Sequence, residues 1–323
     1  MLSEAGPRRK AGRAATAVLV AASVAPDSDA VLALFGREAY LGWHMTVTHS
    51  LPGVLVMAAA IALLARRFTS MKELPAAFTL SLLAMGVHLA MDVTTPWGTA
   101  VLWPLSGARY ALDWVATTDA FVWGLLAAGT AAAWAFRRWA VAAARISLAL
   151  LGGYVLFCAM GHGSAVEYFR ESMGRVRVRP SSIQAFPGFP DPLTWNVVAT
   201  TQDRYWQGRV HSLLGLRGRL AMYLRNPVPA ALDSPAVQSY MEWARLPLLT
   251  FHSTGLEEAS LCDLRFLGRS EGMPFAARLF KSALPGAPAG LPGKAPGVPG
   301  RFEWSDSMAP APPPDMEYEL PGG

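Results

Sequence analysis

Five apolar segments follow one another in the first half of the chain, and four of them approach or reach the ~20 residues that a helix needs to cross a bilayer. They cover residues 14–25, 51–65, 76–91, 120–135 and 140–160, of which the first is the shortest. Only 16% of the 323 residues are charged, against roughly 25% in soluble domains. We therefore predict a mainly α fold, a polytopic membrane helix bundle with about five spans.

The segment at residues 14–25 has two interpretations. It follows a basic start, and Ser23, Val24 and Ala25 would suit cleavage of a secretory signal peptide before Pro26. Without cleavage, the segment is the short first helix of the bundle. Both interpretations stay open at this stage.

Lysine and arginine are distributed unevenly among the loops. Short cytoplasmic loops carry an excess of these residues, whereas the two loops on the other side hold only Arg37 and Arg109. We expect a protein of the cytoplasmic membrane with its N-terminus inside, and with everything after the fifth segment on the outer side. The basic residues assigned to the inner side are Arg8, Arg9, Lys10, Arg13, Arg66, Arg67, Lys72, Arg137 and Arg138.

Six acidic and imidazole side chains lie where the first three apolar segments begin or end. Antiparallel packing would bring these positions to one level, toward the outer face. His88 and Asp92 are four residues apart and share a helix face. Imidazole and carboxylate together suit zinc, and also manganese or iron, with one or two ions bound. The candidate ligands are Asp27, Asp29, His44, His49, His88 and Asp92.

Each candidate also has a purely structural interpretation. In an isolated Asp-x-Asp pattern, Asp27 and Asp29 are more often caps of the next helix or terminators next to Pro26. His44 or His49 alone is more often an interfacial or structural histidine, and the third segment's histidine and acid can form a local pair. The metal site is favoured because all six lie on one predicted side of the membrane.

The same residues carry a resemblance to a known family. The strings Pro-Asp-Ser-Asp at 26–29, His-Met-Thr-Val-Thr-His-Ser at 44–50, His-x3-Asp at 88–92, Thr-Pro-Trp-Gly at 95–98 and Leu-Trp-Pro at 102–104 resemble the YdjM-like (YbcI-like) membrane-bound metal-dependent hydrolases, over about residues 14–165. The family commonly has a histidine where this chain has Ala30, and Arg-Gly where it has Met45 and Thr46. These departures remove one ligand candidate and one anion contact.

The resemblance implies a metal-activated water that attacks an ester or phosphoester of a membrane-proximal substrate, such as a lipid. In that scheme His44, His49, His88 and Asp92 are the primary ligands. Asp27 and Asp29 complete a second ion or orient the histidines, and one of them accepts the proton. Thr48 and Ser50 are expected to cap the second helix rather than to support the ligands.

Two other classes of function remain. One is a non-catalytic membrane protein with a structural metal or polar cluster and an appended domain that binds a partner. The other, a transporter, is less favoured because the sequence has no evident inverted repeat or mid-helix break.

The second half of the chain has a different composition. Residues 1–165 are expected to form the membrane domain, 166–192 a basic, proline-rich linker, 193–281 a small α+β extramembrane domain, and 282–323 a disordered or extended tail rich in proline and glycine. Strands are predicted at 195–200, 205–211, 219–225 and 261–267, and a helix at 236–245.

The remaining titratable residues add one candidate. His162 follows the fifth segment at the expected level of the metal site, so it is a secondary ligand candidate, whereas His211 and His252 lack partners at ligand spacing. We infer no disulfide between Cys158 and Cys262. The expected partners are membrane lipids and a small-molecule or lipid-derived substrate; no aromatic-basic nucleic-acid motif accompanies the net charge of +5.

Overall fold

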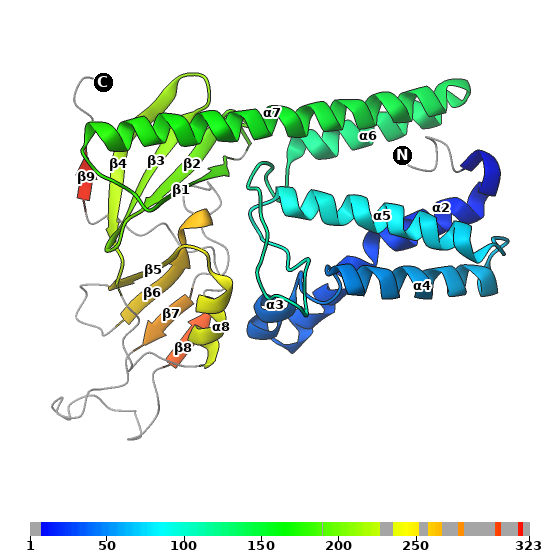
Figure 1. The fold of residues 1–323 in the computed structure, drawn as a ribbon, viewed down its shortest axis with the longest axis horizontal. Coiled ribbons are helices and arrows are strands. Elements are labelled where there is room, and N and C mark those ends of the chain that lie inside the picture. Colours follow the sequence, from blue (N-terminus) through cyan, green and yellow to red (C-terminus); the bar gives the residue numbers. More distant parts are fainter. Residues whose placement is uncertain are drawn as a thin grey trace. The chain divides into compact units, whose positions relative to one another are not determined.

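The computed structural model describes residues 8–188, 190–226, 235–251, 258–266, 277–280, 301–304 and 316–318 (Figure 1). The chain divides into two compact units, Met1–Gly161 and His162–Gly323, which we call unit 1 and unit 2. Each unit is described by itself.

Unit 1 is helical, and its helices begin where the sequence supplies caps. The Ser50 hydroxyl accepts a hydrogen bond from the backbone N–H of Gly53 at 3.0 Å, and Asp119 caps the helix that follows it in the same way. The elements are α2 (Arg8–Val24), the 3-10 helix η1 (Pro26–Phe35), α3 (Arg37–Trp43), α4 (Leu51–Phe68), α5 (Leu74–Thr94), α6 (Ala120–Ala135), η2 (Arg137–Trp139) and α7 (Ala140–Arg175), which continues into unit 2.

Helices α2, α4 and α5 pack through small side chains. One buried cluster joins the start of α2 to the end of α4 and the start of α5, and a second joins the end of α2 to the start of α4 and the end of α5. Helices α2 and α5 therefore run parallel to each other and antiparallel to α4. Alanines let the backbones approach closely, and Ala15, Ala22, Ala58 and Ala77 are fully buried.

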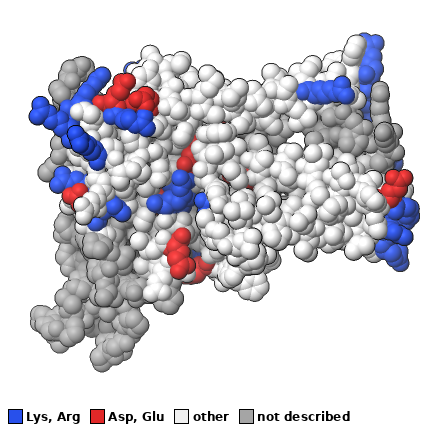
Figure 2. Space-filling view, viewed as in Figure 1, with Lys and Arg blue, Asp and Glu red and all other residues white. Residues whose placement is uncertain are grey.

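The helices support a membrane location. Leu51–Phe68, Leu74–Thr94 and Arg137–Arg175 are long and apolar enough to span a bilayer, and Gly12–Val24 with Pro26–Phe35, bent by 44°, would add a fourth span. The span predicted at residues 120–135 is α6, which is apolar but has 16 residues. Figure 2 shows Lys and Arg gathered at the end of unit 1 where α4 ends and α5 begins. The membrane helices are confirmed by three or four candidate spans, and the number of about five stays a prediction.

Unit 2 contains two antiparallel sheets. The first has the strand order β1-β2-β3-β4-β9 and the second β5-β6-β7-β8. Their bounds are β1 (Ser182–Pro187), β2 (Thr194–Thr200), β3 (Arg204–His211), β4 (Gly215–Leu224), β5 (Pro247–Phe251), β6 (Glu258–Asp263), β7 (Ala277–Phe280), β8 (Arg301–Trp304) and β9 (Met316–Tyr318), with helix α8 (Pro235–Trp243) and the 3-10 turn η4 (Leu264–Phe266).

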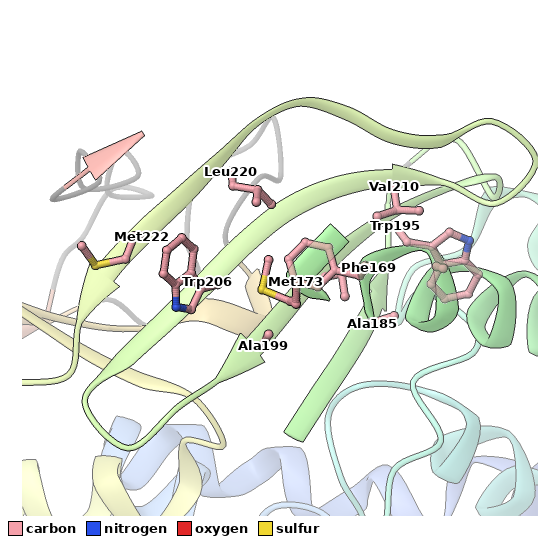
Figure 3. Close-up of a cluster of buried hydrophobic side chains, with 11 residues drawn as sticks. Phe169, Met173, Ala185, Trp195, Ala199, Trp206, Val210, Leu220 and Met222 are labelled. Carbon is pink, nitrogen blue, oxygen red and sulfur yellow. The ribbon is translucent and has the colours of Figure 1, made fainter. Parts of the chain in front are cut away.

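The first sheet is covered on both faces. On one face, Phe169 and Met173 from the last turns of α7 pack against Trp195 and Trp206 (Figure 3). The side chains at the alternate strand positions, such as Val198, point to the other face, where they join a second cluster that includes residues of β5 and β6. Successive side chains of a strand point to opposite faces, so coverage of both faces explains why β2 is buried at every position except its two ends.

Two predicted boundaries differ in the structure. The segment 166–192, expected to be a linker, begins as part of α7 and contains β1. The helix continues because Ala165, Phe169 and Met173 repeat every four residues and bury one stripe against the sheet. The segment was predicted to be a linker because it contains four arginines, which suggested a solvated connector.

The tail also differs in part from the prediction. Arg301–Trp304 and Met316–Tyr318 are strands that pair with β7 and β4, whereas residues 282–323 were expected to be disordered or extended and to bury no core. Backbone pairing with distant strands stabilises them, and composition does not reveal such partners. The other residues of the tail lie outside the described part of the chain.

Candidate metal centre

Three segments of unit 1 supply the polar cluster. The 3-10 helix η1 carries Asp27 and Asp29 in its first turn, directly after Pro26. The loop between α3 and α4 carries His44 and His49. The last turns of α5 carry His88 and Asp92. The packing of α2, α4 and α5 explains why these segments meet at one end of the helices.

Four side-chain atoms converge at the centre. Nε2 of His49 lies 3.5 Å from Oδ1 of Asp27 and 3.5 Å from Oδ2 of Asp92. Nε2 of His88 lies 3.5 Å from Oδ1 of Asp27 and 3.2 Å from Oδ2 of Asp92. Each imidazole therefore faces both carboxylates. The ligand atoms of Asp27, His49 and His88 all lie within 4.8 Å of one another.

The buried polar atoms of this group lack hydrogen bonds. Among the described residues, Nε2 of His49, Nε2 of His88 and Oδ2 of Asp92 are buried without a hydrogen-bond partner. An unsatisfied buried polar atom costs roughly 1–3 kcal/mol, so three at one point need a common explanation. A cation bound between them would satisfy all three.

The spacing fits a small divalent ion. Ligand atoms at the corners of a tetrahedron with zinc bonds of about 2.0–2.1 Å lie about 3.3 Å apart. The four nitrogen–oxygen distances in this group range from 3.2 to 3.5 Å. Two imidazoles and two carboxylates are also a donor set that zinc, manganese and iron accept. Asp27, His49 and His88 therefore fit a metal ion of this kind, and Oδ2 of Asp92 lies within 3.5 Å of both imidazoles.

Asp29 lies behind this group and is fully occupied by the protein. Its Oδ1 accepts from Nδ1 of His44 at 2.7 Å, and its Oδ2 accepts from the Met45 backbone N–H at 3.0 Å and from the Thr48 hydroxyl at 2.8 Å. A carboxylate with this many donors holds surrounding groups in place. Asp29 therefore holds His44, Met45 and Thr48 in place.

Thr48 connects Asp29 to His49. Its hydroxyl donates to Asp29, and its oxygen lies 3.0 Å from Nδ1 of His49. We infer that Nδ1 carries the ring proton and donates it to Thr48, which leaves the lone pair of Nε2 directed at the centre. Burial lowers the pKa of His49, but the carboxylates of Asp27 and Asp29 outweigh burial and raise the pKa above its usual value. Thr48 and Ser50 were both expected to cap the second helix. Ser50 does so, whereas the Thr48 hydroxyl contacts Asp29 and His49.

His44 is held at the edge of the cluster by aromatic rings. Tyr40 stacks on it at 4.4 Å between ring centroids, and Trp97 meets it edge-on at 5.6 Å. Its Nδ1 is hydrogen-bonded to Asp29. His44 and Asp92, both expected to be primary ligands, lie outside the group formed by Asp27, His49 and His88. Asp92 nevertheless faces both imidazoles of that group, whereas His44 faces Asp29.

Arg109 is a structural residue that the sequence analysis did not assign to the site. Its guanidinium donates to four backbone carbonyls, at 3.0 Å to His44, 3.2 Å to Gly98, 3.3 Å to Leu41 and 3.2 Å to Gly42. These bonds fix the loop that carries His44 and His49. The only signal in the sequence was that Arg109 is one of two arginines in the predicted outer loops.

The other histidines lie elsewhere. His162 belongs to unit 2, where its ring centroid lies 5.6 Å from that of Trp195. His211 accepts a hydrogen bond from the Leu213 backbone through Nδ1. His252 lies outside the described residues. Cys158 and Cys262 are both buried free thiols.

The fold and the cluster define a class: a helical membrane protein with a His/Asp group able to hold a metal ion. Residues 1–165 match the family described as YdjM inner membrane protein, and the chain belongs to that family. This confirms the resemblance carried by the motifs. The chain is also similar to the protein YfhP of Bacillus subtilis (strain 168), described as uncharacterized, with 26% identity over 268 residues that cover 80% of this chain and 79% of YfhP. No solved structure matches the chain.

Proposed function

We propose that the protein is a membrane-bound metal-dependent hydrolase in which Asp27, His49, His88 and Asp92 bind a divalent ion, with zinc preferred over manganese or iron. One observation carries the proposal: three buried donor atoms without hydrogen-bond partners among the described residues face one point, at the spacing of ligands around a tetrahedral ion. The family membership supports the membrane setting.

The reaction would be hydrolysis of an ester or phosphoester. When bound, a divalent ion supplies a Lewis acid and lowers the pKa of water toward about 7. Asp27 is the exposed member of the group, with 53% of its side chain accessible, whereas the His49 side chain is fully buried. Substrate and water therefore reach the group on the side of Asp27, whose carboxylate accepts the proton released from water.

The other residues set the geometry. His49 is held by Thr48, and Asp29 holds Thr48 and His44 through its two oxygens. Such outer contacts fix ring orientation and increase ligand basicity. Asp29 therefore acts on the reaction through the histidines, and the proton acceptor is Asp27.

The location of the site argues for a lipid-derived or membrane-proximal substrate. The cluster lies at the ends of apolar helices α2 and α5 and at the start of α4. With the N-terminus inside, as the distribution of basic residues favours, the cluster and unit 2 would face the outer side of the cytoplasmic membrane.

The test uses full-length protein purified in detergent. Bound metal is quantified in the wild type, in His49→Ala and in Asp92→Ala, with His211→Gln as a histidine control outside the site. The expected result is loss of metal in the first two variants only. Unchanged metal content in both would refute the site. Hydrolysis of a generic phosphodiester and of a carboxyl ester, abolished by a chelator and restored by a divalent ion, tests the activity.

One observation favours a second function. Two histidines and two aspartates complete four-coordination by themselves, and closed four-ligand sites are typical of structural metals. In this alternative the ion would hold η1, the α3–α4 loop and α5 together, and unit 2 would bind a partner protein. Metal binding without metal-dependent hydrolysis, accompanied by a large fall in thermal stability on chelation, would support this alternative.

A further inference from the structure

Unit 2 contains a pocket lined by arginine between α7 and the β3–β4 hairpin. The pocket has a volume of about 710 Å³. Arg175 contributes from the last turn of α7, and Arg217 and Arg219 from β4, against the single carboxylate of Glu171. Figure 2 shows Lys and Arg side chains gathered over this end of α7 and β4. The pocket therefore has a net positive charge.

The turn beside this pocket exposes two leucines. Leu213 and Leu214, between β3 and β4, are 68% and 63% accessible. Leu214 is also part of the pocket lining. Two consecutive exposed leucines at a hairpin tip next to arginines form an amphipathic surface, which is the chemistry of a membrane interface.

The leucine tip lies beside the part of α7 that follows its apolar stretch. A side chain at Gly215 would touch the Tyr168 ring, at 3.7 Å, so the tip lies beside Tyr168. The apolar part of α7 ends at Met160, eight residues before Tyr168, and Arg175 follows about two helical turns later. The tip and the pocket therefore belong to the part of the chain that directly follows a membrane helix.

We propose that this pocket binds the phosphate-bearing head group of an anionic phospholipid, while Leu213 and Leu214 enter the membrane surface. Guanidinium groups bind phosphate in a bidentate manner. Arginines near an anionic surface attract it, whereas a zwitterionic surface offers no net charge. The site is independent of the metal centre, and it docks unit 2 on the same membrane that holds α7.

The test compares hydrogen exchange of residues 211–219 in full-length protein reconstituted in lipid nanodiscs. One set contains phosphatidylcholine alone, a second adds phosphatidylglycerol in a titration, and a third adds inorganic phosphate to the phosphatidylcholine set. Slower exchange with phosphatidylglycerol only is the expected result. Equal exchange in all three sets overturns the proposal, and protection by inorganic phosphate without phosphatidylglycerol overturns the assignment to lipid.

Variants separate the two parts of the site. For Arg175→Gln and Arg217→Gln, the phosphatidylglycerol fraction that gives half-maximal protection should rise about fivefold for each arginine removed. Arg179→Gln, an exposed arginine that does not line the pocket, is the matched control and should behave as wild type. Leu213→Ser combined with Leu214→Ser should also reduce protection. Wild-type protection in the arginine variants would overturn head-group binding in the pocket. Wild-type protection in the double serine variant would overturn the role of the leucines. Because these side chains are exposed, wild-type thermal unfolding is expected and serves as the folding check.

Discussion

Nε2 of His88 lies 3.2 Å from Oδ2 of Asp92, one helical turn further along α5. A single helix therefore positions half of the candidate metal centre. The other half comes from two separate segments, the loop that carries His49 and the 3-10 helix that carries Asp27. The geometry of the centre thus depends on how these two segments are held against α5.

Asp29→Asn tests the orienting carboxylate. The asparagine amide nitrogen cannot accept the hydrogen bonds that Oδ2 now receives from Met45 and Thr48. Because such contacts act through the ligands, we expect metal affinity to fall about 10- to 100-fold with the fold retained. Metal titration in detergent measures this. Asp92→Asn, which changes a ligand, should lose more affinity; equal affinities of Asp29→Asn and wild type would contradict the assigned role.

Thr48→Val tests the link between Asp29 and His49. Valine has nearly the shape of threonine but removes the hydroxyl that joins the two residues. We expect roughly tenfold weaker metal binding, because the orientation and tautomer of His49 are no longer fixed. Thr48→Ser keeps the hydroxyl and should restore most of the affinity. Similar affinities for the two variants would show that the hydroxyl has no such role.

Arg109→Lys should destabilise unit 1. The guanidinium donates to four backbone carbonyls, whereas an ammonium group is a compact charge that cannot reach all of them in a fixed fork. Loss of charge-assisted hydrogen bonds should cost about 2 kcal/mol. Thermal unfolding in detergent checks this, with Arg66→Lys, an exposed arginine near the end of α4, as the control. Equal melting temperatures for both variants would argue against the clamp.

Gly208→Ala should destabilise unit 2 by overpacking. A Cβ at Gly208 would lie 2.8 Å from the Phe169 ring and 2.8 Å from Leu216 Cδ1, and forced repacking of a filled core costs about 1–3 kcal/mol. Gly163→Ala on α7 meets nothing within 4 Å and should be neutral or stabilising by up to about 1 kcal/mol. Denaturant unfolding followed by tryptophan fluorescence should therefore show a lower free energy of unfolding for Gly208→Ala and an equal or higher one for Gly163→Ala.

The Cys262 thiol should be inert in the folded protein. Burial raises its pKa to about 12, so almost no thiolate is present at neutral pH. In a Cys158→Ala background, a water-soluble maleimide should modify Cys262 only after denaturant is added. The same shift means that unit 2 loses stability as pH rises above about 9, because the unfolded thiol ionises first. Rapid labelling under native conditions would contradict the buried position.

The membrane helices and the meeting of their ends could be predicted from the sequence. Apolar runs set the helices, and alternating direction brought positions 27, 49, 88 and 92 to one level. The single helix from Ala140 to Arg175 was not predicted, because its last turns bury a stripe containing Phe169 and Met173 against a sheet whose existence the segment itself does not signal. Strands β8 and β9 depend on backbone pairing with distant partners.

For the site, the residue types could be predicted from the sequence. Which of them face the centre and which lie behind could not. Asp27 and Asp29 are equivalent in a sequence string, yet one faces both imidazoles at the centre and the other receives hydrogen bonds from His44, Met45 and Thr48. The direction of a side chain from a 3-10 turn decides this difference, and spacing alone does not encode it. The role of Arg109 was not predicted either. Its hydrogen-bond acceptors are backbone carbonyls, and no residue type in the sequence indicates them.

The acceptors of Arg109 have an evolutionary consequence. The backbone carbonyl is the same in every residue type, so Gly42, where an added Cβ would meet nothing within 4 Å, can change identity without weakening the clamp. Gly98 is constrained, because its φ is +91° and an added Cβ would lie 3.1 Å from Cβ of Arg109. The exposed surface at Gly42 can then vary while the loop bearing His49 stays in place. Relatives that retain this arginine can therefore diverge there at low cost to the architecture of the centre.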